Sequence, residues 1–256
     1  MNTLKSIMCE LLNYEQIYRE LGNFIHILDH LEIIQSIDST NTYLMRKKIK
    51  GIVAVFAEQQ TAGRGQFNRS WFSPFGKNIY LSLLWPITFD ISSGLSLVAG
   101  IALVSALERY GLTNIGLKWP NDLIACNKKL GGVLIETRHV SAQAVLGIGL
   151  NVQPDGLQEN WIDVQTLAGC TPQRNYLAGL ILYELLACLL QLRKYGFKSF
   201  LELWSRLDIL MHKNIVIHTV NAVYEGIACG VDVFGKLRVL IQGDMQCFSS
   251  GSVREY

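Results

Sequence analysis

The sequence lacks the cysteine spacing of a zinc site and any apolar run long enough to cross a membrane. Its six cysteines are widely spaced and none belongs to a Cys-x-x-Cys pair, which fits a reducing cytosol better than a disulfide framework. Residues 95–107 and 177–192 are apolar, but both are shorter than the roughly 20 residues that span a bilayer, so we expect buried core helices. An acidic residue precedes any signal-like apolar region at the N-terminus. We therefore expect a cytoplasmic protein without membrane association.

The chain also lacks a strong charge of either sign. Its formal net charge is +2, and lysines and arginines form no long run, so the charge pattern does not predict nucleic-acid binding. Half of the 256 residues are hydrophobic and 17% are charged, which favours a sizeable core over disorder. This length suits one large domain, or a medium domain with a small appendage.

Two standard phosphate-binding loops are missing as well. No Gly-x-x-x-x-Gly-Lys-Ser/Thr run is present, and Asn68 stands where a dinucleotide fingerprint needs its third glycine. The chain instead has residues 58–71, in which Gly63-Arg64-Gly65, Arg69 and Trp71 lie between two apolar runs. Arginine forks suit carboxylate or phosphate, and a tryptophan face can stack on a base. This segment is either a ligand-binding loop or a basic surface hairpin.

A cluster of capping residues lies at residues 38–42. Ser39, Thr40 and Asn41 follow a strand predicted over residues 31–37 and precede a predicted helix. They either cap that helix or hydrogen-bond a small polar ligand, as helix N-termini can.

A second polar cluster surrounds Pro120. Lys118 is a cation at the end of a predicted strand, and Asn121 and Asp122 follow in a predicted turn. Asp122 is a candidate ligand for Mg²⁺, which prefers oxygen donors. The alternative is an ordinary Asx-type turn.

Glycines mark two further segments. Residues 127–132, with two lysines beside Gly131 and Gly132, are predicted to form a hairpin turn. Gly147 and Gly149 alternate with apolar residues in a predicted strand, which leaves one face bare for close approach by a ligand or another backbone.

Hydrophobic periodicity predicts the remaining elements. Two short amphipathic helices are expected within residues 4–30, and longer helices over residues 93–110, 175–195 and 197–207. From about residue 212 the chain alternates short strands with glycine turns, as in a small barrel.

In this order the motifs resemble one family, the biotin–protein ligases, also called biotin–[acetyl-CoA-carboxylase] ligases. The residues that carry the resemblance are Asp38-Ser39-Thr40-Asn41, the run from Glu58-Gln59 to Trp71-Phe72-Ser73-Pro74, Lys118-Trp119-Pro120-Asn121-Asp122-Leu123, Lys129-Leu130-Gly131-Gly132 with Glu136, and Gly147-Ile148-Gly149-Leu150-Asn151. The resemblance is strong from about residue 31 to residue 153 and fainter toward the C-terminus.

The resemblance implies an α+β fold. A mixed central sheet packed by helices, as in class II synthetase-like catalytic domains, would be followed by a small SH3-like β-barrel. We expect a short helical segment over residues 1–30, the catalytic domain over 31–210 and the SH3-like domain over 211–256. Some relatives begin with a DNA-binding winged helix. Residues 9–30 resemble only the connector that follows it, so we expect no nucleic-acid partner.

The resemblance also implies an ATP-dependent ligase. Such enzymes join biotin to ATP, release pyrophosphate, hold biotinyl-5′-adenylate, and pass biotin to one lysine of the biotin carboxyl carrier protein or domain of acetyl-CoA carboxylase. The residues implied as catalytic are Arg64, Lys118, Asp122 and Lys129, with Asp122 also the candidate Mg²⁺ ligand. The implied biotin-binding residues are Ser39, Thr40, Asn41, Gln59, Gly63, Arg64, Gly65, Gln66, Lys129, Gly131, Gly132, Gly147 and Gly149. The implied ATP- or adenylate-binding residues are Arg64, Arg69, Trp71, Lys118, Asn121 and Asn151.

These residue types suit adenylation chemistry. A carboxylate oxygen must approach a polyanion, so the barrier comes mainly from like-charge repulsion and poor alignment. Cations at Arg64, Lys118, Lys129 and Mg²⁺ lower both. The reaction needs no protein nucleophile, and we assign none to Cys126.

Two departures from the family pattern are relevant to function. Gln66 stands where relatives carry a basic residue that helps retain the adenylate, so we expect looser retention of the intermediate. Ser252 stands where relatives carry a glutamate, which puts the contribution of the terminal barrel to ATP binding in doubt.

Two other functions compete with this interpretation. A lipoate–protein ligase shares the fold and the carrier-lysine chemistry but lacks this arginine-rich loop. A non-catalytic biotin-binding regulator would not need Lys118, Asp122 and Lys129. A homodimer formed by extension of the sheet is possible through an exposed edge strand.

Overall fold

The computed structural model describes residues 10–87, 94–138, 142–154, 156 and 158–256. Its centre is a seven-stranded sheet with the order β1-β2-β3-β7-β6-β5-β4. The strands are β1 (His30–Ile37), β2 (Val53–Gln60), β3 (Ile79–Pro86), β4 (Ile115–Lys118), β5 (Asp122–Ala125), β6 (Lys128–Arg138) and β7 (Gln143–Leu150). Only β1 and β2 pair in parallel among these strands, and the other neighbours are antiparallel. The central sheet is therefore mixed, as predicted.

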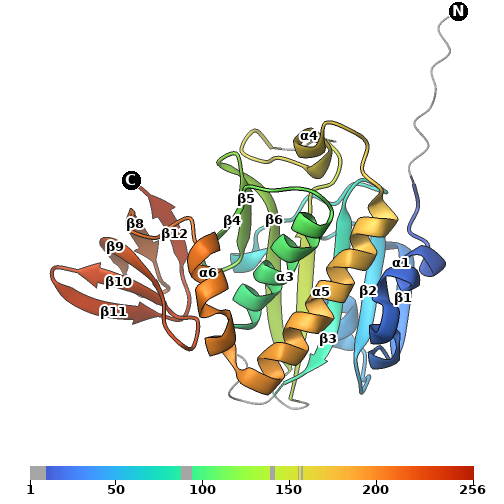
Figure 1. The fold of residues 1–256 in the computed structure, drawn as a ribbon, viewed down its shortest axis with the longest axis horizontal. Coiled ribbons are helices and arrows are strands. Elements are labelled where there is room, and N and C mark those ends of the chain that lie inside the picture. The colour runs from blue at the N-terminus through green and yellow to red at the C-terminus, as the bar shows by residue number, and fades with distance from the viewer. Residues whose placement is uncertain (1–9, 88–93, 139–141, 155, 157) are drawn as a thin grey trace, which may run out of the picture.

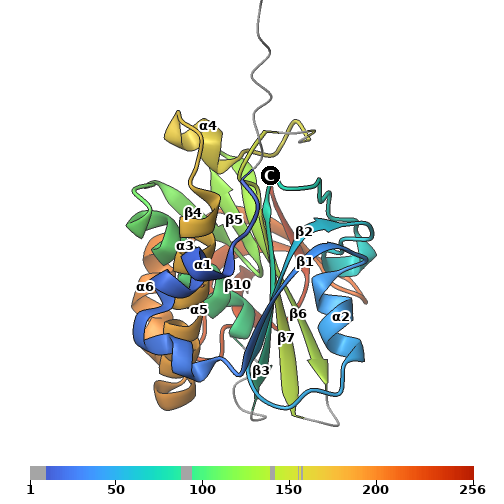
Figure 2. The ribbon, with the colours of Figure 1, turned by 90° about the vertical axis from the view of Figure 1, so that its right-hand side faces the viewer.

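Helices cover the two faces of this sheet unequally. α2 (Thr40–Arg46) lies on one face, and α1 (Tyr14–Leu21), α3 (Leu95–Arg109), α5 (Arg174–Tyr195) and α6 (Leu201–Leu207) lie on the other (Figure 2). Shorter helical elements are the 3₁₀ turns η1 (Gly22–Ile27), η2 (Gln66–Asn68) and η5 (Phe197–Phe200), and α4 (Val164–Ala168). The helices predicted near residues 93–110 and 175–195 are confirmed, although Ser93 itself lies outside the described residues. Of the two short helices predicted near the N-terminus, the second, with Asn13 as its N-cap, is α1, whereas most of the first lies outside the described residues.

α5 is long and apolar enough, by length and composition, to cross a membrane. However, 67% of its most apolar window is buried inside the molecule. Its apolar side chains join those of α1, α3 and the central sheet in one hydrophobic cluster. α5 is therefore a core helix, as the sequence predicts for residues 177–192.

A second, smaller sheet forms the C-terminal part of the chain. Its strands are β8 (Asn214–His218), β9 (Val223–Val231), β10 (Leu237–Ile241), β11 (Asp244–Phe248) and β12 (Ser252–Glu255), in the antiparallel order β11-β10-β9-β8-β12. This sheet lies beyond the β4 edge of the central sheet, far from β1 (Figure 1). Its buried side chains, such as Ile215 and Val239, belong to the main hydrophobic cluster. The predicted α+β fold with a small terminal β domain is confirmed.

The turn between β5 and β6 is not where the sequence predicts it. Cys126 and Asn127 both have positive φ, at 50° and 59°, which is the pattern of a tight type I′ hairpin turn. β6 therefore begins at Lys128, and Gly131 and Gly132 lie inside this strand rather than in a turn.

A buried ion pair anchors the N-terminal segment beside the start of the predicted loop. The carboxylate of Glu58 bonds to the guanidinium of Arg174, and both side chains are almost fully buried. Glu58 also accepts a hydrogen bond from the backbone N–H of Leu12 at 2.5 Å. Because a buried charge that loses its partner is costly, this pair holds the end of β2, and thus the base of the loop, in place.

Candidate active site

A cavity of about 600 Å³ opens between the loop at residues 63–71, the sheet and the C-terminal strand β12. The predicted residues that line it are Ser39, Thr40, Asn41, Arg64, Gly65, Gln66, Arg69, Trp71, Lys118, Asn121, Asp122, Lys129, Gly132, Gly147 and Gly149. The cavity thus brings together residues that are more than 100 positions apart in the sequence, from both predicted substrate sets.

The loop that covers the cavity is a small hairpin. Trp71 N donates to Gly63 O at 2.9 Å, and Gly65 N donates to Arg69 O at 2.7 Å. A Cβ at Gly63 would lie 2.5 Å from Trp71 O, so only glycine lets the two arms of the loop come this close. Phe67, at the tip, has φ 56° and is largely exposed.

The floor of the cavity is the pair of strands β6 and β7. Leu134 pairs with Gly147 and Gly132 pairs with Gly149. A Cβ at Gly147 would lie 2.4 Å from Asn41 Oδ1, and a Cβ at Gly149 would lie 2.6 Å from the ring of Trp71. Two residues of strand span roughly 7 Å, so Asn41 and Trp71 lie over neighbouring positions of the same bare strand face. In this structure two side chains, rather than a ligand or another backbone, approach the bare face.

One end of the cavity is an uncharged hydrogen-bond network. Gln60 Oε1 accepts from Thr40 N at 2.9 Å and from Thr40 Oγ1 at 3.1 Å. Ser82 Oγ, fully buried on β3, lies 2.7 Å from Thr40 Oγ1 and 2.6 Å from Asn41 Oδ1. Ser39 caps α2 by accepting from Thr42 N. The cluster therefore caps a helix. It also faces the cavity, where the ligand contact stays a prediction.

The partners of Asn41 fix the direction of this network. Its Nδ2 donates to Leu134 O at 3.3 Å and to Glu136 Oε2 at 2.9 Å, and both of these are acceptors. Asn41 Oδ1 therefore faces Ser82, and the single hydroxyl proton of Ser82 goes to Asn41. The proton of Thr40 Oγ1 then points to Ser82 or to Gln60. Buried amide and hydroxyl groups with fixed donors and acceptors can recognise a small polar ring by hydrogen bonding.

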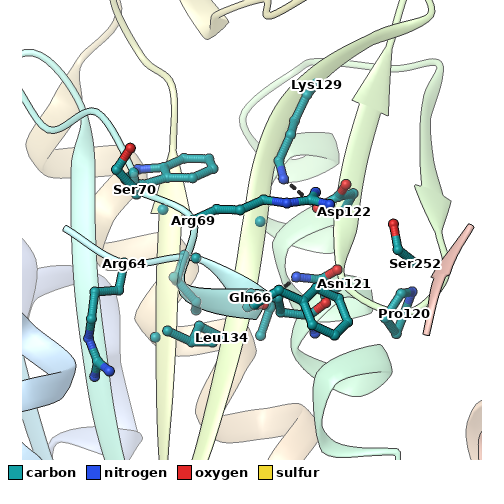
Figure 3. Close-up of a pocket in the computed structure, with 18 of the residues that line it drawn as sticks. Arg64, Gln66, Arg69, Ser70, Pro120, Asn121, Asp122, Lys129, Leu134 and Ser252 are labelled. Atoms are coloured by element: carbon teal, nitrogen blue, oxygen red, sulfur yellow. Dashed lines mark hydrogen bonds and ion pairs between the residues drawn. The ribbon is translucent and has the colours of Figure 1, made fainter. Parts of the chain in front are cut away.

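The other end of the cavity carries cations. Lys129 Nζ lies 2.6 Å from Asp122 Oδ1, and Lys118 is the backbone register partner of Asp122 in the β4–β5 hairpin. Arg69 extends from the loop toward the same carboxylate (Figure 3). Among the described residues, all three cations line the cavity with this single carboxylate, which leaves an excess of positive charge that suits a polyanionic ligand.

Two stacked tryptophans lie beside these cations. Trp71 and Trp161 have ring centroids 4.7 Å apart at 30°, and Lys129 Nζ is 5.3 Å from the Trp71 ring. Trp161 reaches this place because the backbone of its neighbours pairs with Lys129, through Lys129 N to Asn160 O at 2.9 Å and Ile162 N to Lys129 O at 3.0 Å. Trp161 is not among the site residues predicted from the sequence.

Arg64 points away from the cationic end (Figure 3). Its Nη2 donates to Glu136 Oε2 at 2.7 Å, with 38% of the arginine side chain and 24% of the glutamate side chain exposed. In this structure Arg64 therefore ties the loop to β6.

Four predicted residues do not line the cavity. Gln59 pairs with Ser36 on β1 and accepts its hydroxyl proton at 3.3 Å, while the next residue, Gln60, takes the place predicted for it. A Cβ at Gly131 would lie 2.8 Å from Gly149 O, so this glycine allows the strands to approach rather than a ligand. Gly63 serves the loop hairpin described above.

Asn151, the fourth, is fully buried behind the cavity wall. Its Nδ2 donates to Ile162 O at 3.1 Å and to Lys129 O at 3.3 Å. It therefore braces the backbone that carries Lys129 and Trp161. Asn151 does not line the cavity, so the contact with nucleotide predicted for it stays a prediction.

The C-terminal sheet also contributes to the cavity, through Gly251, Ser252, Val253 and Arg254. Trp119 Nε1 donates to Gly235 O at 3.2 Å, which attaches this sheet to the segment that carries Lys118. Ser252, which the sequence analysis singles out as a departure from the family pattern, thus lines the cavity. No cysteine lines the cavity in the described part of the chain, and burial beside Glu184 raises the pKa of the Cys188 thiol, which lies in the core, to about 12.

Comparisons with known proteins agree with this geometry. The Biotin/lipoate A/B protein ligase family matches residues 33–152. The chain is 34% identical to the bifunctional ligase/repressor BirA of Salmonella typhimurium over 95% of this chain and 78% of that protein. It is 31% identical to the biotin–[acetyl-CoA-carboxylase] ligase of Mycobacterium tuberculosis over 87% of this chain and 88% of that protein.

A similar structure is the biotin protein ligase from Aquifex aeolicus in complex with biotin and ATP. It has a TM-score of 0.81 and 25% identity, and the match covers 89% of this chain and 100% of that chain. Sequence, fold and the residues gathered in the cavity therefore agree. The chain belongs to the Biotin/lipoate A/B protein ligase family, and within it to the biotin–protein ligases.

Proposed function

We propose that this cavity joins biotin to ATP, releases pyrophosphate, and passes biotin from biotinyl-5′-adenylate to a lysine of a biotin carboxyl carrier domain. The observation that carries the proposal is a single cavity with an uncharged hydrogen-bonding end and a cationic end. Biotin has the matching form, a neutral ureido ring joined by an aliphatic chain to a carboxylate. A nucleoside triphosphate supplies the polyanion for the cationic end.

The uncharged end would hold the ureido ring. Ser39, Thr40 and Asn41 stand at the start of α2, and Gln60 fixes Thr40 from β2. A site built from buried donors and acceptors rejects ligands that leave those groups unpaired. We therefore propose that Gln60 takes the role that the sequence suggested for Gln59.

The cationic end would carry the chemistry. A carboxylate oxygen of biotin forms a bond to the α-phosphorus, the bond from that phosphorus to the bridging oxygen breaks, and pyrophosphate leaves with the electron pair. Lys118, Lys129 and Arg69 would offset the charge that builds up on the phosphate oxygens. In the second step the deprotonated amine of the carrier lysine attacks the acyl carbon and AMP leaves. We propose that Arg64 contacts the biotin carboxylate and the α-phosphate from the loop.

The residues present fit Mg²⁺ in one respect. Asp122 is the single carboxylate among the described residues that line the main cavity, and Lys129 already bonds to it. Mg²⁺ commonly takes one or two carboxylates and completes its shell with water and substrate phosphates. Asp122 would hold it only together with the phosphates, where it would neutralise charge on the leaving group.

The stacked tryptophans would contact the adenine. Trp71 and Trp161 offer flat apolar faces beside Lys129, and Asn121 lines the same end. Asn151 would act on the nucleotide through the backbone of Lys129.

The domain division follows from the two sheets. We propose a catalytic domain over residues 31–210, a helical segment before it, and an SH3-like domain over 211–256 that helps close the nucleotide end through β12. We also propose a cytoplasmic location, which the free cysteines and the buried α5 support. If the protein forms a homodimer, β1 is an available edge strand of the central sheet.

Exchange of labelled pyrophosphate into ATP tests the proposal, with biotin, lipoate and octanoate as separate acids. Exchange that depends on biotin alone would support the adenylation step. Exchange with lipoate instead would retain the fold and overturn the substrate. Absence of exchange with every acid, together with measurable biotin binding, would point to a non-catalytic regulator. Transfer is then measured with a purified carrier domain and its lysine-to-alanine variant.

A further inference from the structure

Glu136, near the end of β6, is shared by two parts of the cavity that are distant in sequence. Its Oε2 accepts from Arg64 Nη2 at 2.7 Å and from Asn41 Nδ2 at 2.9 Å. Arg64 belongs to the covering loop and Asn41 to the uncharged end. One carboxylate oxygen therefore connects the groups proposed to meet opposite ends of the biotin molecule.

The contact with Asn41 sets the orientation of that amide. With Nδ2 directed at Glu136 and Leu134 O, the Oδ1 atom faces Ser82. The amide lies against Gly147, so it has little room to turn. Glu136 thus helps to present one fixed face of Asn41 to a ligand.

The contact with Arg64 holds the loop. A guanidinium has five N–H donors, and Glu136 bonds to Nη2 alone. The remaining donors are not used by Glu136, so the guanidinium can bond a further acceptor while this bond is kept. Glu136 can therefore hold the loop against β6 without using up the donors of Arg64.

A second ion pair, between Arg109 and Glu184, lies away from the cavity and can be compared with the pair of Arg64 and Glu136. Arg109 Nη1 and Glu184 Oε1 lie 2.6 Å apart and join α3 to α5, but neither residue lines the cavity. The geometry of that pair is as good as that of Arg64 and Glu136. It serves as a matched reference for a purely structural bond.

We propose that Glu136 is a positioning residue for the adenylation reaction: its carboxylate orients Asn41 for the biotin ring and holds the loop closed through Arg64. This inference rests on the proposed function and deepens it. Glu136 does not touch the reacting atoms. Its effect passes through two arms, one toward Asn41 and one toward Arg64, and the charge that strengthens the Arg64 arm can be removed while a hydrogen-bond acceptor for Asn41 is kept.

Glu136→Gln weakens mainly the Arg64 arm. Both donors bond to the same oxygen of Glu136, so the amide oxygen of glutamine can still accept from Asn41 and from Arg64, but the negative charge that strengthens the bond to the guanidinium is lost. We expect faster release of biotinyl-5′-adenylate, by about fivefold, and a biotin KM within about twofold of wild type.

Glu136→Ala breaks both arms. We expect the same faster release and, in addition, a biotin KM raised by about tenfold, because Asn41 loses its orienting partner. The ATP KM should change less than the biotin KM. Glu184→Gln, the matched reference, should leave both KM values and the release rate unchanged.

The experiment measures pyrophosphate exchange over a range of biotin and ATP concentrations, and adenylate release in a separate chase. The melting temperature of each variant is recorded, and Glu136→Gln keeps the test available if Glu136→Ala does not fold. Equal KM values in all three variants, or equal rises of biotin and ATP KM in Glu136→Ala, would contradict the proposal. If wild-type protein shows no biotin-dependent exchange, the proposed function fails instead, and the two failures are distinguishable.

Discussion

The two ends of the cavity are built differently. At the uncharged end Ser39, Thr40, Asn41 and Ser82 are each at most 4% exposed and bond to one another or to neighbouring backbone. At the cationic end the side chains of Lys129 and Asp122 are 26% and 28% exposed. Rigid buried groups suit a ring whose hydrogen bonds must match, whereas more exposed, longer cations can follow the charge as it moves during the reaction. The uncharged end, which we propose holds the biotin ring (the ring end), is therefore preformed. The cationic end, which we propose holds the phosphates, is adjustable.

Removing a cation should produce the largest difference between the effects on the two ends of the cavity. Lys129→Ala takes away a charge where negative charge develops, so we expect kcat for pyrophosphate exchange to fall about 100- to 1000-fold. Biotin affinity measured without ATP should fall far less. Lys128→Ala is the matched control, because Lys128 is the exposed neighbour on the same strand. A similar loss in both variants would mean that the effect is general electrostatics rather than a specific contact.

The same small substitution can be placed at either end. Gly147→Ala would put a methyl group against Asn41, and Gly149→Ala would put one against Trp71. Overpacking of this kind costs about 1–3 kcal/mol, or roughly 5- to 150-fold in binding.

We expect Gly147→Ala to raise mainly the biotin KM and Gly149→Ala to raise mainly the ATP KM. Each variant is the control for the other, since both lie on β7. Calorimetric titration with biotin alone checks the first effect without catalysis. If both variants raised the same KM, the assignment of separate ends would be wrong.

The sequence predicts the fold and the cationic end well for physical reasons. Hydrophobic periodicity marks the long helices and strands, because each must bury an apolar face. Lys118 and Asp122 flank a short turn, so local chain geometry alone places them together on a hairpin.

The rest depends on contacts between distant segments. Trp161 reaches the cavity only because its neighbours pair with the backbone of Lys129, and no local pattern encodes this pairing. Gln59 and Gln60 are adjacent and chemically identical, so the sequence offers no way to choose between them. Ser82 has one available signal, as the single serine within the otherwise apolar and aromatic strand β3. Its part in the hydrogen-bond network can be recognised only when the structure places Thr40 and Asn41 beside it.

Ser82 gives a finer test of the preformed end. Ser82→Ala removes the donor to the buried Asn41 Oδ1 and one neighbour of Thr40 Oγ1. A buried acceptor left without a partner costs about 1–3 kcal/mol. We expect a rise of about tenfold in the biotin KM, with the ATP KM and the kcat of exchange little changed. The biotin KM of Ser82→Cys, which keeps a weak donor, should lie between the values for the wild-type protein and for Ser82→Ala. An equal loss for ATP would show that Ser82 supports the whole cavity rather than the ring end.

A substitution at Gln66 should strengthen ligand binding at the adjustable cationic end instead of weakening it. Gln66 lines the cavity in the covering loop, where the family resemblance leads us to expect a basic residue. Gln66→Arg would add a cation beside a bound adenylate, so we expect release of biotinyl-5′-adenylate to slow by about fivefold. The gain should shrink in high salt, because the new charge is partly screened. Biotin binding without ATP should stay the same, since the ring end is untouched. Release is followed by chasing labelled adenylate with excess unlabelled biotin and ATP, with Gln66→Met as the uncharged control of similar length. Wild-type release that is already as slow as in Gln66→Arg would mean that the cations on β4 and β6 retain the intermediate without help from the loop.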